Sequence, residues 1–447
     1  MDLRASSTER LLRAHARHVP ACSTPQVSTK PQVSTNPRVS TKSGVSTIAP
    51  LLVLVLATLG CATAMASGPG DVRVLIYDSA ASIPVGGSDS VAQVKLVGGA
   101  LRVDGRAVGD RWSPRGSGPW TVGKRVVRGR ITVRAKGDRI QVLNRVGLEH
   151  YVASTVGGEM SASWPREALR AQAVATRTYV LHEASKRRAS AWDVKATIAS
   201  QVYRGIDAET DETRAAAKAT RGEVLTYQGE PILAVFHSTA GGRTATAGEV
   251  WGQDLPYLRV IDVDEEDGAP HTYWRTQFDA KDLNAILEAA GIELAALEGI
   301  SVTRRTPSGR VERLEIRGGT NRVELRGSQL RSLVSALGLR STLFDVRATQ
   351  DGFAFVGSGY GHGVGMSQWG ARALAERGES YQRILARFYP GTRLERRSSR
   401  RASFGTEAIK PTSFMAMSTY MFVEPSTPLA SLSRAGLGRA SRRGELR

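Results

Sequence analysis

The amino-acid sequence predicts an α+β fold. Three observations lead to this class: short strands separated by turns fill residues 72–144, two helices follow around residue 159, and the later strands and helices neither alternate regularly nor form separate blocks. A doubly wound parallel sheet would require regular alternation of the two element types. With 447 residues and 41% hydrophobic side chains, the chain is long enough for two or three domains with a sizeable core.

Hydrophobic patterns place the elements in order. Strands with alternating apolar residues are expected at 72–76, 91–97, 131–135 and 140–143. Helical spacing over 147–156 predicts a helix that Gly157 and Gly158 end, and Ser163 is expected to cap a second helix with Pro165 in its first turn. Further expected elements are a helix at 209–220, strands at 223–227 and 232–237, and a helix that Ser367 and Gln368 begin and that continues through 371–377.

A small α+β subdomain is expected within the main domain. The main domain is assigned to residues 72–395 and the inserted subdomain to about 272–346. The subdomain's expected elements are helices at 280–290 and 327–337 and strands at 300–304, 311–317 and 322–325.

The two ends of the chain differ in composition from the part between them. Residues 1–47 form a low-complexity extension with a repeat that begins at Pro25, Pro31 and Pro37. Residues 48–66 are apolar and end in small residues, which is typical of a signal peptide, so export to the cell envelope, either periplasm or extracellular wall, is expected. A retained membrane anchor and lipidation of Cys61 are the alternatives. The tail, 396–447, is basic and expected to be disordered.

Charge and cysteine content narrow the classes of partner. The net charge is +19, and much of the excess lies in the ends: residues 1–66 hold seven Lys or Arg against two acids, and 396–447 hold ten against three. Such charge suits nucleic acid, an anionic membrane surface or an acidic polymer such as a cell wall, but no motif for nucleic-acid binding accompanies it. Only Cys22 and Cys61 occur, so cleavage after Ala66 leaves no thiol for a disulfide or a thiolate metal site.

Glu159 is the candidate catalytic residue. It interrupts an apolar stretch just before a strongly helical segment, and the glycines before it allow close approach of another molecule to the backbone. The flanking Met160 and Trp164 are expected to exclude water and raise the pKa of the carboxyl, which favours a general acid. The competing interpretation is a glutamate that only stabilises the start of a helix.

A strand that leads into His237 and Ser238 is followed by Gly241 and Gly242, a pattern typical of a strand end that opens into a cleft. Zinc is not expected at His237 because no Cys or second His lies nearby in the sequence. A structural histidine is the competing interpretation.

A glycine-rich segment, 357–371, carries four further candidates for substrate binding. Its alternate glycines expose Tyr360 and His362, and Ser367 and Gln368 then begin a helix. The segment lacks the lysine of a phosphate-binding loop, so nucleotide binding is rejected. Hydrolysis by a Ser-His-Asp triad that uses Ser238 or Ser367 with His362 is a further alternative, although no nucleophile elbow is present.

The second helix adds Gln172 and Arg177, polar groups among alanines, as substrate-binding candidates, and Tyr203 adds an aromatic surface for a sugar. For Arg177 a salt bridge is the competing interpretation. For the aromatic residues it is the hydrophobic core.

Several of these segments, taken in order, resemble the stage II sporulation protein D family of SpoIID/LytB type. The motifs are Gly-Glu-Met-Ser-Ala-Ser-Trp-Pro with Leu-Arg-Ala-Gln-Ala-Val-Ala-Thr-Arg-Thr-Tyr, then Phe-His-Ser-Thr-Ala-Gly-Gly-Arg-Thr, Val-Trp-Gly-Gln-Asp-Leu-Pro-Tyr-Leu, Tyr-Gly-His-Gly-Val-Gly-Met-Ser-Gln-Trp-Gly-Ala and Phe-Tyr-Pro-Gly-Thr. The likeness spans roughly residues 72–394.

The resemblance implies a lytic transglycosylase that acts on peptidoglycan strands lacking stem peptides, with Glu159 as the single acid and base. No cofactor is expected. Some members of the family bind zinc through a histidine and two cysteines, but the loop after His237 has no cysteine. Other members enhance an amidase, so a wall-binding activator of an amidase is the alternative function. Expected partners are glycan strands and, in that alternative, an amidase, with no nucleic acid and no membrane contact beyond the signal peptide or anchor.

Overall fold

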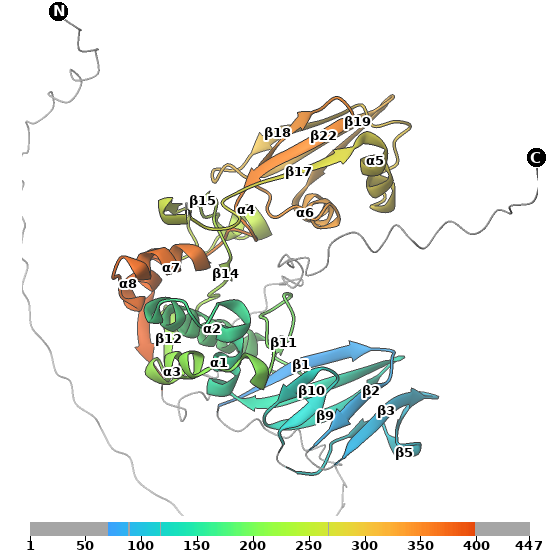
Figure 1. The fold of residues 1–447 in the computed structure, drawn as a ribbon, viewed down its shortest axis with the longest axis vertical. Helices are drawn as coiled ribbons and strands as arrows, with labels where there is room; N and C mark the ends of the chain where they lie inside the picture. Colours follow the sequence, from blue (N-terminus) through green and yellow to red (C-terminus); the bar gives the residue numbers. More distant parts are fainter. Residues whose placement is uncertain (1–69, 88–89, 117, 267, 398–447) are drawn as a thin grey trace, which may run out of the picture. The chain divides into compact units, whose positions relative to one another are not determined.

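The computed structural model describes residues 70–397, apart from 88–89, 117 and 267 (Figure 1). The extension, the signal peptide and almost all of the tail therefore lie outside the described residues. All described residues belong to the second of two units of the chain, Ala64–Arg447. This part contains helices and strands in several sheets, which confirms the α+β class.

The described chain begins with two β-sheets. Their strand orders are β11-β1-β10-β9-β6 and β5-β4-β3-β2-β7-β8. Buried and exposed residues alternate, as in β10, so each sheet has one apolar face, and the apolar faces belong to a shared core. The strands are β1 (Asp71–Ser79), β2 (Ile83–Gly86), β3 (Val91–Val97), β4 (Ala100–Val103), β5 (Arg106–Gly109), β6 (Arg111–Trp112), β7 (Trp120–Val122), β8 (Arg125–Val127), β9 (Arg130–Lys136), β10 (Arg139–Gly147) and β11 (Val194–Lys195).

A group of helices follows the sheets and carries Glu159. The long helix α2 contacts α1, α3, α7 and α8, so it forms the centre of this group. Its alanines allow this close packing on several sides. The helices are α1 (Leu148–Glu159), α2 (Arg166–Lys186), α3 (Asp211–Ala219), α7 (Gln368–Glu376) and α8 (Tyr381–Phe388), with the short 3-10 helix η1 (Ile206–Ala208) before α3.

The predicted end of the first helix is wrong by several residues. Helix α1 continues through Gly157 and Gly158 and ends at Glu159. These glycines serve close packing instead: an added Cβ would lie 1.9 Å from the Ala208 carbonyl oxygen at Gly157 and 2.2 Å from the Val202 carbonyl oxygen at Gly158. At the next helix Pro165, not Ser163, occupies the N-cap position, and no side chain caps it.

The inserted subdomain has a hydrophobic core of its own, with residues from Trp274 to Phe355. Its two sheets have the orders β17-β22-β21 and β18-β19-β20. Strand β22 pairs with β17 along its length, so the subdomain's last strand lies beyond residue 346. Its elements are β17 (Tyr273–Asp279), α5 (Ala280–Ala289), β18 (Gly299–Arg305), β19 (Val311–Gly318), β20 (Asn321–Arg326), α6 (Gly327–Ala336), β21 (Phe344–Ala348) and β22 (Gly352–Ser358).

Short strands connect the helical group with the segments before and after the subdomain. The parallel pair β14 and β23 places His237 opposite Ser367, directly before Gln368 and α7. The predicted strand at 232–237 is therefore a strand only at its last two residues. The short elements are β12 (Glu223–Tyr227), β13 (Glu230–Pro231), β14 (Phe236–His237), β15 (Gly242–Arg243), α4 (Ala247–Trp251), β16 (Asp262–Val263), η2 (Asp264–Glu266), β23 (Met366–Ser367) and β24 (Arg393–Arg396).

Candidate active site

Glu159 lies at the end of α1, where two other segments meet it. Its Oε1 accepts a hydrogen bond of 2.8 Å from the backbone N–H of Val202. Its Oε2 accepts a longer one, 3.5 Å, from the side-chain amide of Gln368. The close approach of the Val202 backbone to Gly158 accounts for the first contact, because a larger residue would push the segment away. The predicted catalytic acid is thus held by two segments that are distant from it in the sequence.

The surroundings of Glu159 raise the pKa of its carboxyl. Burial is the largest cause, since it disfavours the charged form, and the hydrogen bonds from Val202 and Gln368 and the charge of Arg204 act in the opposite direction. The residue as a whole is partly exposed. Among the described residues, the groups that act on this carboxyl are an N–H, an amide and a guanidinium, and none is a second carboxylate. The arrangement suits a single group that first donates a proton and then accepts one.

Glu266 is a site residue that the sequence did not indicate. It is buried, and its carboxylate accepts hydrogen bonds of 3.0 Å from the backbone N–H groups of both Ala240 and Gly241. It also accepts a hydrogen bond from the hydroxyl of Ser367. Ser367 in turn caps α7 through the N–H of Gly370 at 3.1 Å. Glu266 therefore fixes the loop after His237 to the start of the helix that begins with Gln368. No local motif marks it, because its partners are distant in the sequence.

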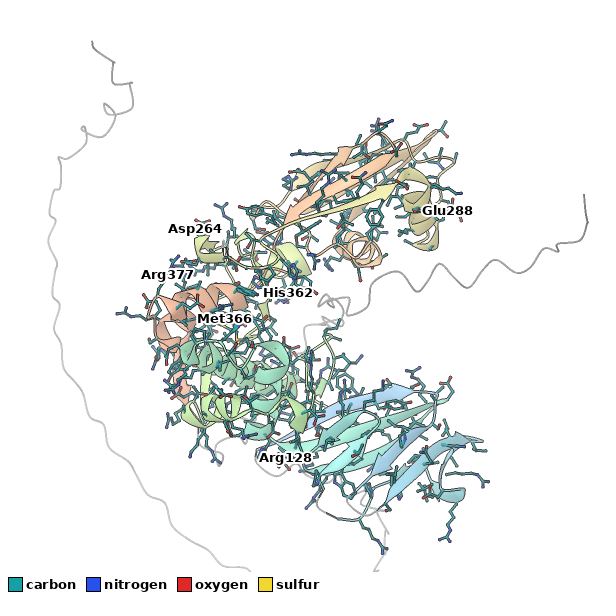
Figure 2. All side chains as sticks on the ribbon, viewed as in Figure 1. Arg128, Asp264, Glu288, His362, Met366 and Arg377 are labelled. Carbon is teal, nitrogen blue, oxygen red and sulfur yellow. The ribbon has the colours of Figure 1, made fainter. Side chains whose placement is uncertain are left out.

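The structure brings together two of the predicted histidines. The ring centroids of His237 and His362 lie 5.6 Å apart, and that of Trp251 lies 5.2 Å from that of His362. Figure 2 labels His362 among the side chains of the described residues. His237 Nδ1 is 3.1 Å from the carbonyl oxygen of Val364, and His362 Nδ1 accepts a hydrogen bond of 3.0 Å from the Val364 N–H. Burial lowers the pKa of both imidazoles, that of His362 to about 4, so both are neutral near pH 7.

His237 has one ring nitrogen without a partner among the described residues. Within residues 70–397 and outside the gaps, no three His, Cys, Asp or Glu side chains are grouped so that they would hold a metal ion. His237 Nε2 is buried and has no hydrogen-bond partner in the described chain, so its lone pair is available to a small polar group.

An aromatic cluster is formed by residues that follow Glu159 and Gln368 in the sequence. Trp164 lies shortly after Glu159 in the sequence, and Trp369 follows Gln368 directly. The centroids of the two rings lie 5.0 Å apart in an edge-to-face arrangement. The guanidinium of Arg372 lies 4.7 Å from the centre of the Trp369 ring and 5.4 Å from that of Trp164. All three side chains are partly buried. The cluster offers flat aromatic surface of the kind that sugar rings pack on.

Arg177, Tyr203 and Gln172 are placed inside the fold. The Arg177 side chain is fully buried, forms an ion pair of 2.6 Å with Glu149 and donates to the carbonyl oxygens of Ala217 and Glu223. This placement favours the salt-bridge interpretation over substrate binding. The hydroxyl of Tyr203 donates to Asn144 at 2.8 Å, and its ring stacks on Tyr151.

Gln172 is also fully buried and donates to Thr176 at 3.3 Å. Arg177 and Tyr203 connect α1 to neighbouring segments, and the hydrogen bond of Gln172 lies within α2. Polarity among alanines predicts a substrate-binding role for Gln172 and Arg177, and an aromatic ring predicts one for Tyr203, but neither signal separates a cleft from a buried network.

Ser238 and Tyr360 contribute mainly through the backbone. The Ser238 carbonyl oxygen accepts hydrogen bonds from the Trp369 N–H at 3.1 Å and from the Ser367 hydroxyl at 3.2 Å. Tyr360 is buried, its ring lies against His271, and its backbone pairs with Thr239. The hydroxyl of Ser367 is thus already bound by two acceptors, which argues against Ser367 as a nucleophile.

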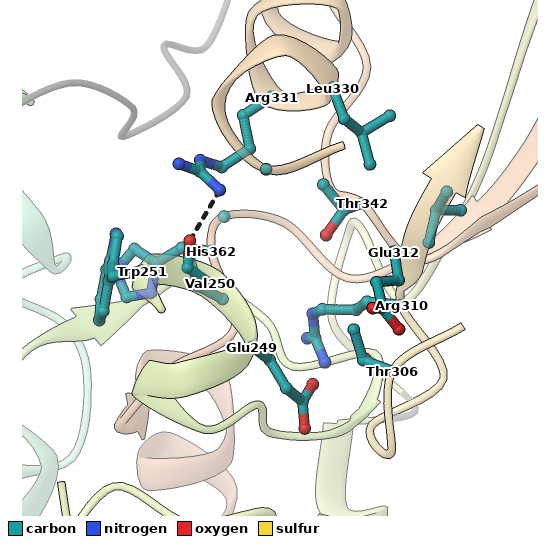
Figure 3. A pocket seen from close by; sticks show the side chains of 13 residues that line it. Glu249, Val250, Trp251, Thr306, Arg310, Glu312, Leu330, Arg331, Thr342 and His362 are labelled. Atoms are coloured by element: carbon teal, nitrogen blue, oxygen red, sulfur yellow. Dashed lines mark hydrogen bonds between the residues drawn. The ribbon is translucent and has the colours of Figure 1, made fainter. Parts of the chain in front are cut away.

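A pocket lies beside His362 (Figure 3). Its charged lining consists of two cations, Arg310 and Arg331, and two acids, Glu249 and Glu312. Arg331 donates to the carbonyl oxygen of Val250 at 2.7 Å, the bond drawn in Figure 3. Arg310 is buried and donates to the carbonyl oxygens of Ala240 and Arg243, both at 3.0 Å. The subdomain thereby holds the loop that follows His237.

Known proteins are similar to this chain in sequence. Stage II sporulation protein D of Bacillus subtilis (strain 168) is 30% identical over 270 residues, which cover 57% of this chain and 76% of the relative. The chain belongs to the stage II sporulation protein D family. The family model for stage II sporulation protein matches residues 136–227, which contain Glu159 and α2. A second family model, a domain of unknown function, matches residues 247–365 and so spans the inserted subdomain.

Two further relatives are similar to this chain over more than half of its length. The amidase enhancer of Bacillus subtilis (strain 168) is 32% identical over 285 residues, and the match covers 54% of this chain but only 39% of that protein. An uncharacterized protein of Brachyspira hyodysenteriae is 31% identical over 255 residues, 57% of this chain and 68% of the relative. Among the described residues, no helix has the length and hydrophobicity that a membrane span requires.

Proposed function

We propose that this SpoIID-family protein is a peptidoglycan lytic transglycosylase that cleaves the MurNAc-GlcNAc bond of glycan strands without stem peptides. The observation that carries the proposal is the environment of Glu159: a carboxyl with a raised pKa on a partly exposed residue, an amide donor and, among the described residues, no second carboxylate that acts on it. Ordinary glycosidases pair two carboxyl groups across the bond, whereas this reaction needs one.

The chemistry follows from one group that acts twice. Protonated Glu159 donates its proton to the glycosidic oxygen, and the bond from that oxygen to the anomeric carbon breaks. The C6 hydroxyl oxygen of the muramic acid whose bond has broken then attacks the anomeric carbon of that sugar. The Glu159 carboxylate accepts the proton that this hydroxyl loses. The products are a free 4-hydroxyl end and a 1,6-anhydro end, and no water is consumed. Burial keeps the acid protonated at higher pH than usual, and the Val202 N–H and Gln368 amide stabilise the carboxylate.

Export to the cell envelope forms part of the proposal. The apolar segment 48–66 and the basic ends of the chain support it. The peptidoglycan substrate is accessible only outside the cytoplasmic membrane, so the two parts of the proposal agree.

The second candidate function is that of a wall-binding enhancer of an amidase. The relative named amidase enhancer favours it, although the match covers only 39% of that relative. The enhancer role requires no acid at position 159, so replacement of Glu159 distinguishes it from the transglycosylase function. Triad hydrolysis is less well supported, because Ser367 caps α7 and donates its hydroxyl to Glu266 and Ser238.

The deciding experiment compares the full chain with its Glu159→Gln variant on denuded glycan strands, with mass spectrometry of the products. We expect anhydro-ended fragments from the unchanged protein and none from the variant. Glu183→Gln, which alters an i,i+4 ion pair with Arg187 on α2, is the matched control and should retain activity. Equal product from Glu159→Gln would refute the assignment. The enhancer function would be established by two results together: no form releases product on its own, and every form, including Glu159→Gln, speeds digestion by an added amidase.

A further inference from the structure

The first two sheets carry the positive charge of the folded chain. Residues 71–147 hold fourteen Lys or Arg and six Asp or Glu, whereas residues 148–395 hold thirty and thirty-one. The excess between the two chain ends therefore belongs to the β-sheets and not to the helices around Glu159. Charge concentrated in one part of a fold can attract a polyanion to that part alone.

Within the five-stranded sheet, much of this charge is gathered on one face. Directly paired residues of an antiparallel sheet point to the same side. The register pairs Arg130 with Arg145, Lys136 with Arg139, and Arg134 with Arg111. The neighbouring positions on the opposite side, such as Ile131 and Val133, are buried in the core. We call the outer side the basic face and define it by Arg111, Arg130, Arg134, Lys136, Arg139 and Arg145.

Like charges directly opposite each other destabilise a sheet, so three such pairs on one face act against folding. Only part of this repulsion is relieved within the protein. Arg139 forms an ion pair with Asp78 at 2.7 Å, and Arg145 with Asp71 at 3.0 Å.

The remaining cations lack such compensation. Arg134 is bonded to the neutral amide of Gln141 at 2.9 Å, and burial together with the charge of Arg111 lowers its pKa. Arg111, Arg130 and Lys136 are exposed, and no acidic side chain of the described chain pairs with them. Like-charged pairs that lower stability and leave cations without an ion pair are expected where an anion from outside the protein binds them.

We propose that the basic face binds a linear phosphodiester polymer of the cell wall, at a site separate from the one that contains Glu159. Neighbouring strands lie about 4.8 Å apart and alternate residues of a strand about 7 Å apart, so the cations form a flat grid that can follow a chain of regularly spaced phosphates. The inference goes beyond the proposed cleavage reaction, and only the choice of a wall polymer rests on it.

Two other anionic partners fit the face less well. Membrane-surface binding combines basic residues with exposed apolar ones, but the exposed large hydrophobic residues of the described chain are Val91, Val97, Tyr273 and Leu394, and none belongs to this face. Binding of single-stranded nucleic acid relies on exposed aromatic rings for stacking. Trp112, on β6, pairs with Val133 and so points to the other side of the sheet.

The test measures binding of the full chain to immobilised poly(glycerol phosphate) at several salt concentrations. The variant combines Arg130→Glu with Lys136→Glu. The control combines Lys281→Glu with Arg347→Glu, two exposed residues of the subdomain, and changes the net charge equally while leaving both chain ends intact. We expect affinity at low salt to fall about tenfold or more in the variant, with a salt slope shallower by about 1–2, and little change in the control.

Stability provides a second readout. Because Arg130 faces Arg145, the single substitution Arg130→Glu should replace repulsion by attraction and raise the melting temperature while it weakens polymer binding. Equal loss of binding in variant and control, or no loss in either, would overturn the proposal. So would a larger loss on phosphatidylglycerol vesicles or on DNA than on the wall polymer. Cleavage of short soluble glycan should be the same in all forms, which separates failure of this proposal from failure of the cleavage function.

Discussion

Gln368, the first residue of α7, donates a hydrogen bond to Glu159, the last residue of α1, across 209 positions of the sequence. The N-terminus of one helix thus faces the C-terminus of another at the proposed acid. The amide stabilises the ionised carboxyl, whereas burial stabilises the protonated form. The balance of these two effects sets the pH at which Glu159 can donate a proton, and the following predictions depend on it.

Replacement of Gln368 should shift the pH profile of cleavage. Gln368→Leu removes the amide that favours the carboxylate, so the pKa of Glu159 should rise further. The limb of the profile in which the protonated acid is lost should then move to higher pH, and the maximal rate should fall by about tenfold as the carboxyl loses its orientation. The measurement is kcat/KM against pH on denuded glycan. A limb that moves to lower pH would contradict the assigned direction.

The Glu159→Gln variant should be at least as stable as the unchanged protein at neutral pH. A carboxyl whose pKa is raised in the folded state binds more protons there than in the unfolded state, so its effect on stability becomes unfavourable as pH rises above its usual pKa of 4.5. The amide of the variant carries no such charge and retains an oxygen for the Val202 N–H. Melting temperatures should therefore favour the variant near pH 7 and converge in acid. A less stable variant at pH 7 would show that Glu159 is mainly a structural residue.

Loss of Glu266 should reduce both stability and activity. Glu266→Ala leaves the N–H groups of Ala240 and Gly241 without their acceptor, which should cost about 2–4 kcal/mol of unfolding free energy. Because Ser367 also loses this partner, the start of α7 and with it Gln368 should shift. Urea unfolding and the rate on glycan measure the two effects. Asp264→Ala, an exposed acid of the same short helix, is the control and should change neither.

Arg177 should prove to be a stabilising residue. Arg177→Met breaks a buried ion pair with Glu149 and several hydrogen bonds to carbonyl oxygens, so a loss of about 3 kcal/mol or more is expected. Arg170→Met, which breaks a partly exposed pair with Glu167 on the same helix, should cost less than about 1 kcal/mol. Under conditions where both remain folded, KM for glycan should be unchanged. A raised KM for Arg177→Met alone would restore the substrate-binding role.

Several features of the structure followed from the sequence because they depend on neighbouring residues. Alternating apolar residues placed β1, β3, β9 and β10, and helical spacing placed α1 and α2 within a few residues. Glu159 and Gln368 were both selected as site residues from local motifs, and the structure joins them directly. The strand before His237 was placed correctly at its end only, since most of that segment lies in loop conformation.

The remaining features depend on contacts between distant segments. Gly157 and Gly158 looked like a helix end, yet they continue α1 because Ala208 and Val202 approach too closely for any side chain. Glu266 carries no motif of its own, and its three partners become neighbours only when β14 pairs with β23. Arg177, among alanines, shows the same local pattern whether it lines a cleft or a buried network, so only the position of Glu149 distinguishes the two.

The separation of Glu159 and Gln368 also affects the order in which the protein is made. During synthesis α1 and α2 leave the ribosome well before β23 and α7, and the whole inserted subdomain emerges between them. A nascent or truncated chain that stops before Ser367 contains the acid but neither its amide donor nor the serine that Glu266 anchors. The complete acid site therefore forms only once Gln368 has been added, when nearly all of the described region has been made.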